Sequence, residues 1–124
     1  MSERIPAIKV LLLPKDTNAL GTIFGGVILS YIDQAGAIEA RRQGALLIVT
    51  VSMDKVVFHE PVYVGDLVSF YTEAIRIGRS SVTVKVTVKA SRAQADMATV
   101  TVTEAQVVYV NLDEERRPAP IGDA

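Results

Sequence analysis

The chain has 124 residues, of which 49% are hydrophobic and 22% are charged, and its formal net charge is −1. This length predicts one domain over residues 1–124, because independent domains usually run to about 100–200 residues. The near-neutral charge argues against electrostatic, sequence-blind binding of nucleic acid. With no cysteine and one histidine, His59, disulfides, thiolate nucleophiles, Cys-ligated metals and paired-histidine sites are excluded. Because the chain lacks both a membrane-spanning run and the order of a signal peptide, we expect a cytoplasmic protein without a membrane partner.

The predicted elements begin with a strand and a single helix. Residues 5–13 are strand-like up to Pro14, and residues 15–26 form a loop with three glycines. From residue 25 to residue 42 apolar side chains recur at helical spacing. The only ionisable residues between Gly25 and Ile38 are Tyr31 and Asp33. A helix that is apolar on nearly every side should be buried nearly all round.

The rest of the chain is typical of four strands with short connections. We expect strands over residues 45–58, 67–77, 81–89 and 98–110. In the third strand valine alternates with threonine or lysine, as in a half-buried strand. In the fourth strand the alternation slips around residues 104–106, which indicates a bulge. The tail from Asp113 is polar and carries two prolines, so we expect it to be loosely held.

This order of elements predicts an α+β protein with the layout called the hot-dog fold. An antiparallel sheet of about five strands would wrap around one long central helix, because short connections imply antiparallel neighbours. A single sheet cannot cover a whole helix. We therefore expect a second copy of the protein to cover the remaining side.

Asp33 is the first candidate for chemistry, because aspartate is a poor helix residue and here it lies in mid-helix. At spacings of three, four and seven it shares a face with the small residues Gly26, Ser30, Ala37 and Ala40. Such a face would let a sheet or a ligand approach. Its carboxylate could be catalytic, or it could bond to amides or a tyrosine and hold a dimer together. Burying an unpaired carboxylate costs several kcal/mol, which favours a partner or a catalytic role.

The glycine-rich loop supplies two further candidates. Gly25 and Gly26 open the helix, where free amides and the positive end of the dipole can hold an oxyanion. The same glycines could instead serve close packing, and no Gly-Lys-Ser/Thr follows that would make the loop a phosphate loop. Asn18, in the same loop, most often makes an Asx turn in such a position, and it could also hold a water.

The remaining polar residues are ambiguous. His59 could be a general base or a surface residue at a strand end, and we favour the second because no orienting partner or nucleophile stands near it in the sequence. The absence of Gly-x-Ser-x-Gly argues against a serine hydrolase. Five cations could meet a polyphosphate or form a solvated hairpin: Arg76, Arg79, Lys85, Lys89 and Arg92.

Two stretches of the chain resemble a known family. Residues 16–36, Asp-Thr-Asn-Ala-Leu-Gly-Thr-Ile-Phe-Gly-Gly-Val-Ile-Leu-Ser-Tyr-Ile-Asp-Gln-Ala-Gly, resemble the motif of the broad-specificity acyl-CoA thioesterases with the hot-dog fold. Residues 49–66, Val-Thr-Val-Ser-Met-Asp-Lys-Val-Val-Phe-His-Glu-Pro-Val-Tyr-Val-Gly-Asp, look like a second block of that family. Residues 77–81 and 103–109 extend the resemblance.

The resemblance implies a set of site residues. The helix aspartate of these enzymes corresponds to Asp33 and the loop asparagine to Asn18, one from each of two hot-dog units. Amides near Gly25 and Gly26 would address the thioester carbonyl. Many relatives carry histidine where Phe24 stands, so here the backbone alone would supply the donors. Similar proteins often assemble as trimers of dimers.

We therefore expect hydrolysis of fatty acyl-CoA to free fatty acid and CoA, with no metal or organic cofactor. Asp33 would act as general base, or as a nucleophile that forms an anhydride. Arg79, Ser80 and Ser81 would contact CoA. Two alternatives stay open: a hot-dog hydratase or dehydratase, which would need His59 in the site, and a non-catalytic module that binds acyl-CoA.

Overall fold

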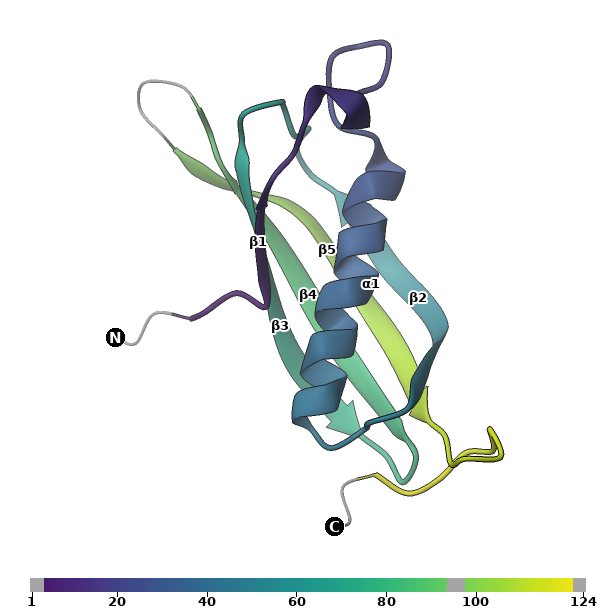
Figure 1. Cartoon of the computed structure of the whole chain (residues 1–124). Helices are drawn as coiled ribbons and strands as arrows, with labels where there is room; N and C mark the ends of the chain where they lie inside the picture. Colours follow the sequence, from purple (N-terminus) through teal and green to yellow (C-terminus); the bar gives the residue numbers. More distant parts are fainter. Residues whose placement is uncertain (1–3, 94–97, 122–124) are drawn as a thin grey trace.

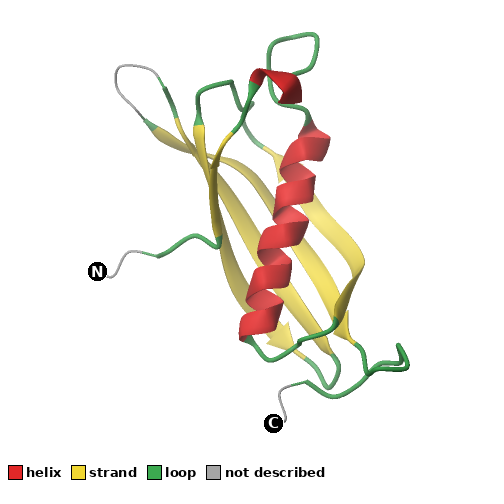
Figure 2. Cartoon of the chain, viewed as in Figure 1, coloured by secondary structure: helices red, strands yellow, loops and turns green. Residues whose placement is uncertain are grey.

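The computed structural model describes residues 4–93 and 98–121. In these residues one helix and five strands form the structure, with a short 3-10 helix before the main helix (Figures 1 and 2). Their bounds are β1 (Ile8–Leu11), η1 (Pro14–Asp16), α1 (Gly25–Arg42), β2 (Ile48–Phe58), β3 (Leu67–Ile77), β4 (Ser81–Ser91) and β5 (Thr99–Asn111). The predicted order, the helix and all five strands are confirmed, with strand ends displaced by three residues at most.

The strands form one antiparallel sheet in the order β1-β3-β4-β5-β2, so β1 and β2 are its edges. Helix α1 lies across one face of this sheet (Figure 1). The alternation predicted for β4 is confirmed: the side chains of Val82, Val84, Val86 and Val88 are fully buried, while Thr83, Lys85 and Thr87 between them are half-buried. The valines form the floor on which the helix rests.

The apolar sequence of the helix predicted that it is buried nearly all round. Within one chain it is buried on one side only. Ile28, Ile32 and Ala35 are buried, whereas Ser30 and Gln34 are exposed. A single sheet covers only one side of the cylinder. On the predicted small-residue face around Asp33, Gly26 and Ser30 are uncovered, whereas Ala40 is buried.

The bulge of β5 lies earlier in the strand than predicted. Val102 and Thr103 are both buried, and the register with β4 shifts at this point. Residues 104–106 keep a regular alternation. The irregularity opposite them belongs to β2, which carries two residues between Asp54 and Val57 where β5 has one. Lys55, in that bulge, has a positive φ of 54°.

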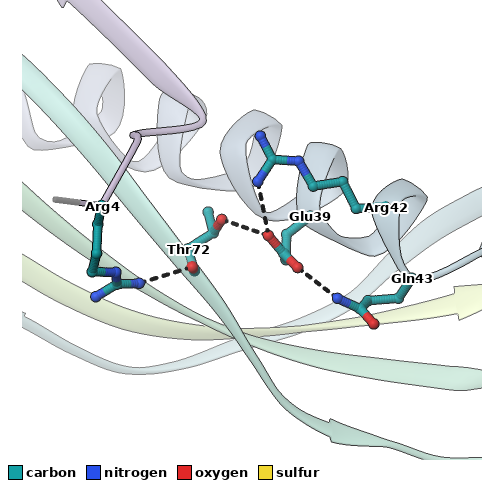
Figure 3. A network of polar contacts seen from close by, with 5 residues as sticks. All are labelled: Arg4, Glu39, Arg42, Gln43 and Thr72. Carbon is teal, nitrogen blue, oxygen red and sulfur yellow. Dashed lines mark hydrogen bonds and ion pairs between the residues drawn. The ribbon is translucent and has the colours of Figure 1, made fainter. Parts of the chain in front are cut away.

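Buried polar contacts fasten the C-terminal half of α1 to β3 (Figure 3). The carboxylate of Glu39, a residue only 8% exposed, accepts hydrogen bonds from the Thr72 hydroxyl at 2.9 Å, from Gln43 at 2.7 Å and from Arg42 at 3.3 Å. Arg4 in turn donates to the Thr72 carbonyl oxygen at 2.9 Å. These three donors satisfy a carboxylate that would otherwise be costly to bury.

The segment after β5 folds back along the turn between β3 and β4. The Ile121 amide donates to the Arg79 carbonyl at 2.9 Å, and the Asn111 side chain donates to the carbonyls of Ala119 and Pro120 at 3.2 Å. Residues 122–124, the end of the tail predicted to be loose, lie outside the described residues. None of the helices in the described part of the chain is long and apolar enough to cross a membrane.

Candidate functional site

Asp33 lies half-buried in the middle of α1. Its carboxylate oxygen Oδ1 accepts a hydrogen bond of 2.7 Å from the Thr50 hydroxyl. Thr50 reaches the helix because it stands opposite the buried Tyr109 in the β2–β5 pair. Thr50 was not among the residues singled out from the sequence, where the available signal was a hydroxyl between two valines, Val49 and Val51. The partner expected for Asp33 therefore comes from the same chain.

Tyr109 holds the backbone of α1 at the same point. Its hydroxyl donates a hydrogen bond of 2.6 Å to the carbonyl oxygen of Asp33. Gly36 makes room for the ring, because a Cβ there would collide with the hydroxyl and stand 2.9 Å from the ring carbon Cε2. Burial raises the pKa of the Tyr109 hydroxyl well above its ordinary value, and the charge of Asp33 and a hydrogen bond with it raise this pKa further. Tyr109 therefore remains a donor at neutral pH.

The N-terminus of α1 is open. The N-cap residue, Phe24, makes no side-chain cap, and Gly25 and Gly26 are exposed. Within residues 4–93 and 98–121 the amides of these two glycines find no acceptor. The two glycines differ in surroundings: a Cβ at Gly25 would stand 3.3 Å from the Phe58 ring, whereas one at Gly26 would meet nothing within 4 Å. Close packing against Phe58 thus explains why residue 25 is a glycine. Both amides can donate a hydrogen bond to a ligand oxygen.

The Asx turn expected at Asn18 is confirmed. Its carbonyl oxygen accepts hydrogen bonds from the amides of Leu20 at 2.9 Å and Thr22 at 3.2 Å, and its amide group donates to the Thr22 hydroxyl at 2.8 Å. The side chain therefore shapes the loop that leads into α1. An asparagine amide carries two donor hydrogens, so one remains for another group.

His59 has an orienting partner, contrary to the sequence-based expectation. Its Nε2 lies 3.0 Å from a carboxylate oxygen of Glu104, and Lys85 lies 3.6 Å from the other oxygen. Glu104 is 45 residues away in sequence. It lies close to His59 because it pairs with Val57 between β2 and β5. The sequence near His59 therefore carries no sign of this contact. The described residues contain no group of three or more side chains placed to hold a metal ion.

A hollow of about 350 Å³ opens beside the N-terminus of α1. It is lined by Ile23, Gly25, Ile28, Phe58, His59, Glu60, Pro61 and Val62. Arg92 fixes the connection that forms one wall: its guanidinium donates to the Pro61 carbonyl at 2.9 Å and to the Asp66 carboxylate, and it lies over the Tyr63 ring at 5.1 Å. Arg92 is therefore held in a largely buried ion pair with Asp66 and does not belong to a solvated, charged hairpin.

The sequence as a whole matches known proteins. The family model of the thioesterase superfamily matches residues 20–96. The chain belongs to this superfamily. The acyl-CoA thioester hydrolase YciA of Escherichia coli K12 is 35% identical over 113 residues, which are 90% of this chain and 86% of that protein.

Solved structures agree with the family assignment. A hexameric hotdog fold thioesterase of Campylobacter jejuni is 44% identical with a TM-score of 0.89, over 94% of this chain and 90% of the other. A hexameric broad specificity acyl-coenzyme A thioesterase, in a form with one aspartate replaced by alanine, is 34% identical with a TM-score of 0.92 over 97% and 88%. The predicted hot-dog fold and the family resemblance are confirmed.

One chain of this thioesterase does not bring all the predicted site residues together. Arg79, Ser80 and Ser81 lie at the turn between β3 and β4, beside the C-terminus of α1 (Figure 1). The amides of Gly25 and Gly26 lie at the other end of a helix of 18 residues, about 27 Å long at 1.5 Å per residue. Asp33 lies between the two ends. Within one chain these groups are therefore spread along the whole length of the helix.

Proposed function

We propose that this protein hydrolyses the thioester bond of fatty acyl-CoA and releases a free fatty acid and CoA. The observation that carries the proposal is the half-exposed carboxylate of Asp33, oriented by Thr50 on a helix whose first amides are open. Membership of the thioesterase superfamily supports the reaction. Relatives named as acyl-CoA thioester hydrolases support the substrate class.

In the proposed reaction, the Asp33 carboxylate takes a proton from a water as the water oxygen attacks the thioester carbon. The negative charge moves to the carbonyl oxygen, where amides of Gly25 and Gly26 stabilise it. One such donor typically contributes about 3 kcal/mol. When the carbonyl forms again, the carbon–sulfur bond breaks and the CoA thiolate leaves, taking up the proton that Asp33 had accepted. Attack by the carboxylate itself, through an anhydride, is the alternative route.

The spacing along α1 supports a site shared between two chains. Gly26 and Asp33 are seven residues apart, which is about 10 Å along the helix axis. Within one chain, the thioester carbonyl and the water would have to bridge this distance between the amide and the carboxylate. They could do so only in a nearly straight line. A nucleophile approaches a carbonyl well away from the C=O axis, so that arrangement is unfavourable. We assign Asp33 to one chain, and the Gly25 and Gly26 amides together with Asn18 to its partner.

This arrangement makes self-association part of the function. Asn18 would position the water or the acyl group, and Arg79, Ser80 and Ser81 would contact the CoA nucleotide from a neighbouring chain. We propose a trimer of dimers, because thioesterases similar in structure are described as hexameric. Each chain would contribute one thioesterase domain over residues 1–124, which ends in a loosely held tail from about Asp113.

Thiol release, ester binding and enoyl hydration together separate this proposal from the alternatives. The protein is incubated with acetyl-CoA, hexanoyl-CoA, decanoyl-CoA and palmitoyl-CoA, and free thiol is titrated over time. We expect thiol release with at least one ester. Binding of the esters without thiol release would favour the non-catalytic module. Hydration of an enoyl-CoA without thiol release, read from the loss of enoyl absorbance, would favour the hydratase.

A further inference from the structure

Phe58 occupies a distinctive place in the hollow beside α1. It is the last residue of β2, and its ring lies against Gly25, so close that a Cβ at that glycine would stand 3.3 Å from the ring carbon Cζ. The apolar side chains around it are well covered, with Ile23 at 6%, Ile28 at 2% and Val62 at 4% exposure. Phe58 itself is 48% exposed. The ring therefore forms an accessible wall of the hollow, immediately beside the open amides.

The position of the ring matters for any thioester held by those amides. Two groups extend from the carbonyl carbon, the acyl chain and the sulfur of CoA. The CoA part ends in charged phosphates and must stay in water, whereas the acyl chain gains by leaving water. The hollow is lined by the buried aliphatic side chains of Ile23, Ile28 and Val62, and its polar lining residues are His59 and Glu60. The acyl chain is thus the group that passes the Phe58 ring and enters the hollow.

We propose that Phe58 is a specificity-determining residue that limits the length of the acyl chain this enzyme accepts, an inference that rests on the function proposed above. The hollow measures about 350 Å³, near the lower end of the roughly 300–1,000 Å³ of ligand pockets. Short and medium acyl chains therefore fit beside the ring. Longer chains have to displace it or remain partly in water.

The test changes the volume of the side chain in both directions. Phe58→Leu removes part of the ring volume, and Phe58→Trp adds to it. The control is Val57→Ala, because Val57 precedes Phe58 in β2, is 47% exposed, and stands opposite Glu104, outside this hollow. For each protein, kcat/KM is measured for acyl-CoA esters from acetyl to palmitoyl, together with its thermal unfolding and assembly size.

We expect Phe58→Leu to move the preferred chain length upward and Phe58→Trp to move it downward. Each methylene gained or lost in an apolar pocket should change kcat/KM about tenfold or more. The activity with acetyl-CoA, whose single methyl group does not extend past the ring, should change within about threefold, and Val57→Ala should keep the wild-type profile. An equal loss at every chain length, an unchanged profile in folded variants, or failure of both Phe58 variants to fold would overturn the proposal.

A second readout keeps this inference separate from the catalytic one. If the wild-type protein releases thiol from none of the esters, the proposed hydrolysis fails. The same chain-length series is then titrated calorimetrically as non-hydrolysable thioether analogues of acyl-CoA. Opposite shifts of the preferred length in the two variants would still support Phe58 as the limiting residue, and affinity profiles that match the wild-type profile would refute it.

Discussion

Thr50 and Tyr109 are opposite one another in the β2–β5 pair, and both bond to the same residue of α1. The Thr50 hydroxyl donates to the carboxylate of Asp33 at 2.7 Å, and the Tyr109 hydroxyl donates to its backbone carbonyl at 2.6 Å. One cross-strand pair thus fixes both the side chain and the backbone of Asp33. The register of two strands decides where this carboxylate stands.

Tyr109→Phe removes the contact with the backbone carbonyl and should change how stability depends on pH. At neutral pH the variant should be less stable by about 1 kcal/mol, the usual contribution of one hydrogen bond. Because folding raises the pKa of Tyr109, its contribution is complete below about pH 10, the ordinary value in the unfolded chain, and is lost as the pH rises above it. The stability advantage of the wild type should therefore narrow above pH 10, by at most about 1.4 kcal/mol per pH unit. Urea unfolding of both proteins at pH 8 and pH 11 measures the difference in their free energies of unfolding. If both proteins lose the same stability between the two pH values, the prediction is wrong.

Asp33→Asn should preserve the fold and remove most of the turnover. The amide is nearly isosteric, and its oxygen can still accept the Thr50 hydrogen bond, but it is neither a base nor a nucleophile. We expect kcat to fall by about 10²–10⁴-fold, the usual contribution of a general base. Gln34→Asn is the control, since Gln34 is the next residue of α1 and is exposed. Near-normal turnover of a folded Asp33→Asn protein would make Asp33 structural.

Thr50 should act by positioning Asp33. Thr50→Val keeps the shape of the side chain and removes the hydroxyl, whereas Thr50→Ser keeps the hydroxyl. We expect the valine variant to lose about tenfold to 100-fold in kcat with little change in KM, and the serine variant to recover most of that loss. Thr83→Val is the matched control, because Thr83 lies in β4, two strands away from Thr50, between the buried residues Val82 and Val84. If Thr50→Val and Thr50→Ser are equally active, the Thr50 hydroxyl does not position Asp33 for catalysis.

The shared site can be tested by mixing two inactive proteins. Asn18→Ala and Asp33→Ala are prepared separately, and each should be severely impaired. When they are unfolded, mixed equally and refolded together, about half of the dimers should contain one chain of each kind. In such a dimer one site carries both changes and the other carries neither, so total activity should recover to about a quarter of the wild type. Mixed dimers identified by mass spectrometry without any recovered activity would mean that both residues act within one chain.

His59→Ala should leave thioester hydrolysis within a few-fold of the wild type, although the histidine has a partner in Glu104. Half-exposed ion pairs of this kind contribute about 1 kcal/mol or less to stability, so the variant should also unfold at nearly the wild-type temperature. The comparison uses initial rates of thiol release and thermal unfolding. A loss of 100-fold or more would assign His59 to acid–base catalysis and favour the hydratase-like alternative.

The parts of this protein that the sequence predicted depend on neighbours along the chain. Helical spacing predicted α1 and alternating valines predicted β4, because each pattern repeats within one element. Asp33 stood out for the same local reason, as the one acid in an apolar stretch of helix. The order of the elements was then enough to predict one helix against an antiparallel sheet.

Only the tertiary structure decided which side chains meet. Thr50 and Asp33 are 17 residues apart, His59 and Glu104 are 45 apart, and Tyr109 and Asp33 are 76 apart. Each of these contacts depends on strand register, and β2 and β5 both carry bulges that shift it. A shift of one residue turns every following side chain to the other face of the sheet, so hydrophobic pattern alone could not place Thr50 below the helix or Glu104 beside His59. The tertiary structure also left one side of α1 uncovered, because a single sheet reaches only the side on which the helix rests.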